Sequence, residues 1–165
     1  MTAKVNGTDN SVAAPAFVGS DATTGIYFPT TGQLAVSISG TQTALFASTG
    51  VSNITLSNPT VTNYLESVVA IGNSGTTQTL SLTNGTVQTV TLTGNCTFTM
   101  PTATAGKSFV VIASTGAGSF TGTFTSVKWS GGTAPTFTTT ASRWDIFSFF
   151  SDGTNWYGSA IQNFS

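Results

Sequence analysis

The chain has 165 residues, enough for one domain of ordinary size or a small domain with an extended arm. Only 5% of its residues are charged, against about a quarter in an average soluble domain, and the formal net charge is -1. This composition excludes the basic surface with which proteins bind nucleic acid, and its weak self-repulsion suits a protein packed against copies of itself or a larger assembly.

Residues 1–16 are predicted to form a polar N-terminal arm, because they contain too few large apolar side chains to fold alone. Their polar start does not resemble a signal peptide, and no apolar run approaches the roughly 20 residues that span a bilayer. We therefore expect synthesis in the host cytoplasm and no membrane insertion.

Residues 17–57 are predicted to form a shaft-like segment of short β-strands. Leu34, Val36 and Ile38 alternate with polar residues, Gly40 interrupts the pattern, and Leu45 opens a second strand. Two short strands alone are marginal in water, so such a segment gains stability by pairing with copies of itself. We hypothesise an intertwined homotrimer, which a stable folded monomer in equilibrium sedimentation would contradict. The apolar residues predicted to hold the trimer or its anchor are Phe17, Ile26, Tyr27, Phe28, Leu34, Val36, Ile38, Leu45 and Phe46.

Residues 58–75 are predicted to be a connector, and residues 76–165 a head domain. Turn signals recur at intervals of about ten residues in the head, as at Asn84-Gly85 and Asp152-Gly153. This spacing is typical of an antiparallel β-sandwich, here predicted to be jelly-roll-like. Helix-forming patterns are missing throughout the sequence, so the predicted fold class is all-β. The run Phe109–Ala113 is apolar at every position, which predicts a central strand covered on both faces.

Catalytic and metal-binding chemistry has few candidate residues. The chain has no histidine and only five Asp and Glu residues, which excludes a serine triad or a histidine-based metal site. We expect no enzymatic activity, no cofactor and no metal. Asp145 and Asp152 could approach one another across a hairpin, but a turn with Gly153 explains Asp152 fully. Loop oxygens leave calcium as a weaker alternative, although the candidate ligands do not cluster.

Two further features have structural explanations. Gly106-Lys107-Ser108 resembles the end of a phosphate-binding loop, but Pro101 stands where the first glycine is required and a β-branched strand follows. We predict a simple turn there. Cys96 alternates with Phe98 and Met100, which predicts a small buried hydrophobe rather than a reactive thiol.

The aromatic stretch Trp144–Ala160 is predicted to be a hairpin that turns at Ser151–Asn155. Its first strand has two faces, one with Trp144, Ile146, Ser148 and Phe150, the other with Asp145, Phe147 and Phe149. Because both faces are apolar, we expect a core on one side and a subunit interface on the other. The alternative is a glycan-binding platform of exposed rings. Its candidate contact residues are Trp156, Tyr157, Asn155 and Trp129.

The same region carries a resemblance to a known group of proteins. The motif positions are Lys128–Gly132, Pro135, Asp145, Asp152–Thr154 and Trp156–Gly158. With the stretch Leu92–Ser114 upstream, they resemble the β-rich domains that end many tailed-bacteriophage fibre and virion surface proteins. Separately, Gly19–Gly50, with its Asp-x-x-x-Gly-Ile-Tyr start, resembles the shaft segment of phage fibres.

The resemblance implies a homotrimeric virion structural protein with an arm or shaft first and a globular head last. The brevity of the chain favours a capsid decoration, cement or head-fibre protein that anchors by its N-terminal part at the virion surface. The alternative is a short tail fibre that attaches to the host through surface carbohydrate. The implied partners are copies of the chain and either the major capsid protein or tail and portal components, so the resemblance leaves head and tail locations open.

Overall fold

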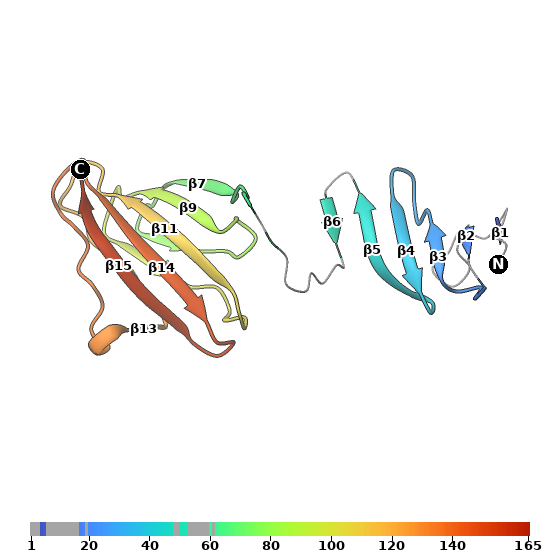
Figure 1. Ribbon diagram of the computed structural model, residues 1–165. Helices are drawn as coiled ribbons and strands as arrows, with labels where there is room; N and C mark the ends of the chain where they lie inside the picture. Colours follow the sequence, from blue (N-terminus) through green and yellow to red (C-terminus); the bar gives the residue numbers. More distant parts are fainter. Residues whose placement is uncertain (1–3, 6–16, 19, 48–49, 53–59, 61) are drawn as a thin grey trace. The chain divides into compact units, whose positions relative to one another are not determined.

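The computed structural model in Figure 1 describes residues 4–5, 17–18, 20–47, 50–52, 60 and 62–165. The chain divides into two compact units, Met1–Thr62 and Asn63–Ser165. Over the described residues the protein is all-β, as predicted, and its single helical element is the short 3-10 turn η1, Ser130–Gly132. Apart from Lys4 and Val5, the predicted arm of residues 1–16 lies outside the described part.

The first unit contains one antiparallel sheet whose six strands follow chain order. These strands are β1 (Lys4–Val5), β2 (Phe17–Val18), β3 (Gly25–Tyr27), β4 (Leu34–Ile38), β5 (Thr41–Ala47) and β6 (Gly50–Ser52). Strands β4 and β5 are joined by a two-residue turn in which Ser39 and Gly40 both have positive φ, at 50° and 75°. That geometry matches the right-handed twist of the flanking strands, so the turn fixes their pairing.

The second unit contains two sheets. The large sheet has the strand order β13-β15-β14-β11-β9-β7 (Figure 1). The small sheet has the order β12-β10-β8. The strands of the large sheet are β7 (Val68–Asn73), β9 (Val87–Thr91), β11 (Ser108–Ser114), β13 (Val127–Trp129), β14 (Trp144–Ser151) and β15 (Trp156–Phe164). Those of the small sheet are β8 (Thr77–Thr79), β10 (Cys96–Thr99) and β12 (Gly122–Phe124).

The predicted antiparallel, jelly-roll-like pairing is wrong for most of the second unit. Only β11–β14 and β14–β15 are antiparallel, whereas β7–β9, β9–β11, β13–β15, β8–β10 and β10–β12 are parallel. The cause is that the chain alternates between the two sheets from β7 to β13. Each of these strands therefore runs in the same direction as the previous strand of its own sheet.

Part of the predicted connector also belongs to the second unit. Residues 68–73 form β7, which pairs with β9 from Val68↔Val87 to Asn73↔Thr91. The run Val68–Ile71 supplies the reason, since four successive apolar residues favour an ordered strand over a solvated linker.

The core of the second unit is an aromatic cluster to which both sheets contribute side chains. The ring of Phe124 on β12 lies 5.0 Å from Phe98 on β10 and 4.9 Å from Phe147 on β14, centroid to centroid. Phe109 and Trp156 meet edge to face at 5.2 Å. The buried members of the cluster are Leu80, Val90, Leu92, Cys96, Phe98, Met100, Phe109, Val111, Ala113, Phe124, Phe137, Phe147, Phe149 and Trp156. Cys96 is buried as predicted.

Candidate interaction surfaces

The sheet of the first unit has one face rich in exposed apolar side chains. Cross-strand pairs Phe17↔Ile26↔Val36 and Leu34↔Phe46↔Val51 turn toward the same side, because paired residues on neighbouring strands share a face. Val36 is half-buried, and the other large side chains of this face are between 37% and 57% exposed. We call this surface the first-unit face, and its residues are Phe17, Ile26, Phe28, Leu34, Val36, Ile38, Phe46 and Val51.

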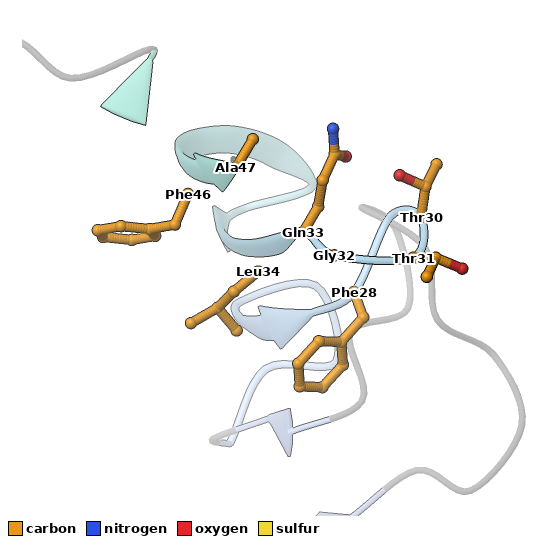
Figure 2. Close-up of a pocket in the computed structure, with 8 residues that line it drawn as sticks. All are labelled: Phe28, Thr30, Thr31, Gly32, Gln33, Leu34, Phe46 and Ala47. Carbon is orange, nitrogen blue, oxygen red and sulfur yellow. The ribbon is translucent and has the colours of Figure 1, made fainter. Parts of the chain in front are cut away.

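A groove of about 680 Å³ lies at one end of this face. Figure 2 shows Phe28, Leu34 and Phe46 projecting to the same side of the sheet at the groove, with the Thr30–Gly32 turn at its edge. No described residue that lines it is ionisable. The groove is therefore suited to apolar contacts.

The opposite face of the first sheet is closed. Val18, Tyr27, Ala35 and Ser37 are buried on it, and Tyr27 donates a hydrogen bond of 2.6 Å from its hydroxyl to Oε1 of Gln42. Tyr27 pairs with Ala35, which pairs with Leu45, so all three share this side. Of the nine residues predicted to hold the trimer or its anchor, Tyr27 and Leu45 thus lie on this closed face and not on the first-unit face. Tyr27 is next in sequence to Ile26, and Leu45 is next to Phe46. Successive side chains of a strand point to opposite sides of the sheet, so each lies on the side opposite to its neighbour.

The large sheet of the second unit also has an exposed apolar face. Rows of cross-strand partners run Val68↔Val87↔Val110 and Ile112↔Ile146↔Ile161, followed by Phe150↔Tyr157. Val68, Phe150 and Ile161 are 62%, 54% and 67% exposed. We call this surface the second-unit outer face, and its residues are Val68, Val87, Val110, Ile112, Trp144, Ile146, Phe150, Tyr157 and Ile161.

Strand β11 was predicted to be covered on both faces, and within the single chain it is covered on one. Phe109, Val111 and Ala113 are buried in the core. Val110 and Ile112 alternate with them and are only half-buried on the second-unit outer face. The hairpin strand β14 was likewise predicted to have one face in a core and the other in a subunit interface. Within the single chain Phe147 is buried in the core and Phe150 is exposed.

The predicted glycan platform does not assemble as one surface. Trp156 is 2% exposed, and its Nε1 donates a hydrogen bond of 2.7 Å to the backbone oxygen of Pro101, so its ring is part of the core. The prediction of Trp156 as a contact residue is therefore wrong, because it faces inward where Tyr157 faces outward. Trp129 is half-buried and lies flat on Gly158, where a Cβ atom would come within 2.5 Å of the indole.

Tyr157 and Asn155 form a small network with Asp152 at the tip of the hairpin. The Asp152 carboxylate accepts hydrogen bonds from the backbone N–H of Asn155 at 2.7 Å, from that of Thr154 at 2.8 Å and from the Tyr157 hydroxyl at 2.9 Å. These bonds hold the pKa of the Asp152 carboxyl below its ordinary value. The hydrogen bond to Asp152, with its negative charge, raises the pKa of Tyr157. The network stabilises the turn predicted for Asp152.

Asp145 does not pair with Asp152. Asp145 is fully buried near the start of β14, and Asp152 is exposed beyond its end. Seven residues of strand separate their Cα atoms by roughly 23 Å. Asp145 instead accepts hydrogen bonds from Thr138, Gln162 and the backbone N–H of Asn163. This role was not predicted from the sequence, although Asp145 lies on the same face of its strand as the other inward-facing side chains.

Among the residues that the structure describes, no group of three or more histidine, cysteine, aspartate and glutamate side chains is placed to hold a metal ion. Within that same part of the chain, no helix is long and apolar enough to span a membrane. No protein-family model matches the sequence, and comparisons with curated proteins and with solved structures returned no significant match.

Proposed function

We propose that this protein is a non-enzymatic structural component of a bacteriophage virion, a homotrimeric capsid decoration, cement or head-fibre protein. Its first unit trimerises and anchors, and its second unit is a β-sandwich head exposed at the particle surface. The partners would be copies of the chain and a virion protein such as the major capsid protein.

The observation that carries the proposal is the first-unit face. Monomeric soluble proteins rarely expose a contiguous apolar patch larger than a few hundred Å². Here Phe17, Ile26, Leu34 and Phe46 are each at least 37% exposed on one side of a single sheet. A sheet with an apolar face gains stability when a second layer covers it, and copies of the same chain supply such a layer.

Three copies are favoured over two by the resemblance of Gly19–Gly50 to phage fibre shafts. In a threefold arrangement each sheet turns its apolar face toward a common axis, and no face is left open. Low charge supports the same assignment, because four Lys and Arg against five Asp and Glu leave little repulsion between closely packed copies.

The β-sandwich assignment of the head rests on the shared core of its two sheets. Phe124 of the small sheet stacks on Phe98 of the same sheet and packs against Phe147 and Phe149 of the large sheet. Layered sheets that share one aromatic core are the general design of sandwich domains.

The first test is the mass of the purified full chain by equilibrium sedimentation. A trimer has three times the 16.8 kDa of one chain, and a stable folded monomer would overturn the proposal. The second test counts copies per particle by quantitative mass spectrometry against the major capsid protein. A capsid-scale number supports a decoration or cement role, and particles lacking the protein should then lose resistance to heat or osmotic shock while still adsorbing to cells.

A small multiple of three copies per particle would instead favour the second candidate, a short tail fibre that binds host-surface glycans. One observation favours it. Trp129 lines a pocket of about 260 Å³ together with Ser130, Thr133 and Pro135. Aromatic rings with neighbouring hydroxyls suit sugar rings. Thr133→Trp would fill this pocket from an exposed position, and loss of glycan binding or adsorption in that variant would support this function.

A further inference from the structure

We propose that the second-unit outer face is a contact between copies of this chain, so that the heads of the oligomer pack against one another. The inference deepens the proposed function, because it rests on an oligomer that brings the heads together. It adds a second interface, formed by residues other than those of the first-unit face.

The chemistry of the surface is the first argument. At its centre, Val110 of β11 lies between Val87 of β9 and Ser148 of β14, and Ile112 lies between Thr89 and Ile146. Burying one such side chain completely contributes about 1.5–3 kcal/mol relative to leaving it in water. Ile161 is 67% exposed, so much of this free energy is unused in the single chain.

Charge identifies the occupant as a second copy. Six residues of the second unit are charged: Glu66, Lys107, Lys128, Arg143, Asp145 and Asp152. On strands β7, β9, β11, β14 and β15, none of them lies on the second-unit outer face. Lys128 of the edge strand β13 pairs with Tyr157 of β15, so it lies at the border of this face. A surface whose one charged residue lies at its border offers a foreign partner little electrostatic complementarity, which is the usual source of specificity between different proteins. Two identical copies of its five central strands, by contrast, meet without bringing like charges together.

The size of the surface fits a contact that acts together with another interface. Five strands at about 4.8 Å spacing and about seven residues in length cover a patch about 20–25 Å on each side, roughly 500 Å² per copy. Stable interfaces bury at least about 1,000 Å² in total, so this surface lies near the lower limit. We therefore expect the heads to associate when their chains are already joined through the first units, since linkage raises the effective concentration.

The second-unit outer face has hollows that can accept apolar side chains. A hollow of about 380 Å³ lies between Phe150, Tyr157 and Ser159, and a smaller one of about 120 Å³ lies beside Trp144 and Ala70. Projecting side chains such as Val68 and Ile161 would fill hollows of this kind on a second copy.

The test measures whether the surface is covered in the purified full chain. Ser159→Cys places a thiol at an exposed position on the second-unit outer face. Thr97→Cys is the matched control, because Thr97 is exposed on the central strand of the small sheet. The native Cys96 contributes little background, since it is buried and burial raises the pKa of its thiol. Each variant is reacted with a maleimide, and its oligomeric state is measured by sedimentation.

We expect an oligomer in which Ser159→Cys reacts at least about tenfold more slowly than Thr97→Cys, equivalent to about 1.4 kcal/mol of protection. An oligomer in which both thiols react at the same rate overturns the head contact and leaves the proposed trimer standing. A monomer in which both react equally overturns the head contact and the proposed trimer together. Because no other protein is present, protection that is lost when the chain is diluted to monomers assigns the cover to a second copy.

Discussion

The carboxylate of Asp145 holds Thr138 at two atoms. One carboxylate oxygen accepts the backbone N–H of Thr138 at 2.7 Å, and the other accepts its hydroxyl at 2.7 Å. The same carboxylate accepts the backbone N–H of Asn163 at 2.9 Å. A fully buried side chain on β14 thus ties the segment before the hairpin to the end of β15.

Asp145→Ala should destabilise the second unit by about 3 kcal/mol, because it leaves the partly buried N–H groups of Thr138 and Asn163 without this acceptor. Asp145→Asn, which keeps the size but turns an amide toward those donors, should cost somewhat less. The measurement is the free energy of unfolding in urea. Asp152→Ala is the control for loss of an exposed carboxylate, and an equal effect at both positions would contradict the assigned role of Asp145.

Adjacent aromatic residues on β15 should respond in opposite ways. Trp156 is in the core and Tyr157 is 43% exposed. Trp156→Ala should cost about 3–5 kcal/mol, whereas Tyr157→Ala should cost about 1 kcal/mol or less. Thermal unfolding of the two variants compares them directly. A stable Trp156→Ala variant that has lost only a binding activity would restore the platform interpretation.

The sequence did not predict that Trp156 is buried while its neighbour Tyr157 is exposed. Alternation assigned Phe147 and Phe149 to one face of β14 correctly, because a strand has a period of two. The face of Trp156 depends on the register across the hairpin, Ser151↔Trp156, and a slip by one residue exchanges inside and outside. Aromatic character alone does not determine that register.

The direction of the strands in the second unit could not be predicted from the turn residues, for a different reason. The turn at Asn84-Gly85 indicates that a strand, β9, begins soon after it. The turn residues do not determine which of the two sheets that strand joins. Because the chain alternates between sheets, β9 lies between β7 and β11 and is parallel to both. Asp145 was missed similarly, since its hydrogen-bond partner Thr138 comes from a segment without a strand pattern.

Gly158→Ala should displace the Trp129 ring. A Cβ atom at Gly158 would lie 2.5 Å from the indole, and the ring itself packs 5.9 Å from Phe149. We expect a loss of about 1–3 kcal/mol from this overpacking. Unfolding followed by tryptophan fluorescence measures it, with Ser159→Ala as the control on the exposed side of the same strand. In the Trp129→Ala background the cost of Gly158→Ala should disappear, and a cost that persists would contradict the contact.

The hairpin tip should lose stability in acid. Because the folded-state pKa of Asp152 is lowered, its contribution is present above the ordinary carboxyl pKa of about 4 and is lost as the pH falls through the folded value. The difference in urea midpoint between the native chain and Asp152→Asn should therefore be largest near neutral pH and shrink below about pH 4. In Tyr157→Phe, titration of the Asp152 carboxyl by NMR should give a pKa that is higher than in the native chain. It should still lie below the ordinary value, because the N–H groups of Asn155 and Thr154 remain. A difference that stays constant across the pH range would contradict the assigned network.

Phe46→Lys should separate folding from association in the first unit. Phe46 is 43% exposed in the single chain and lies beside Leu34 on the first-unit face, so a lysine there leaves the closed face of the sheet intact. In an oligomer the same ammonium group would be buried against apolar side chains, which we expect to cost about 3 kcal/mol or more per copy. Each copy should thus weaken association more than about 100-fold, measured by sedimentation over a range of protein concentrations. Ala22→Lys adds the same charge at an exposed turn outside this face and should remain associated. Unchanged association of Phe46→Lys would show that the oligomer is held elsewhere in the chain.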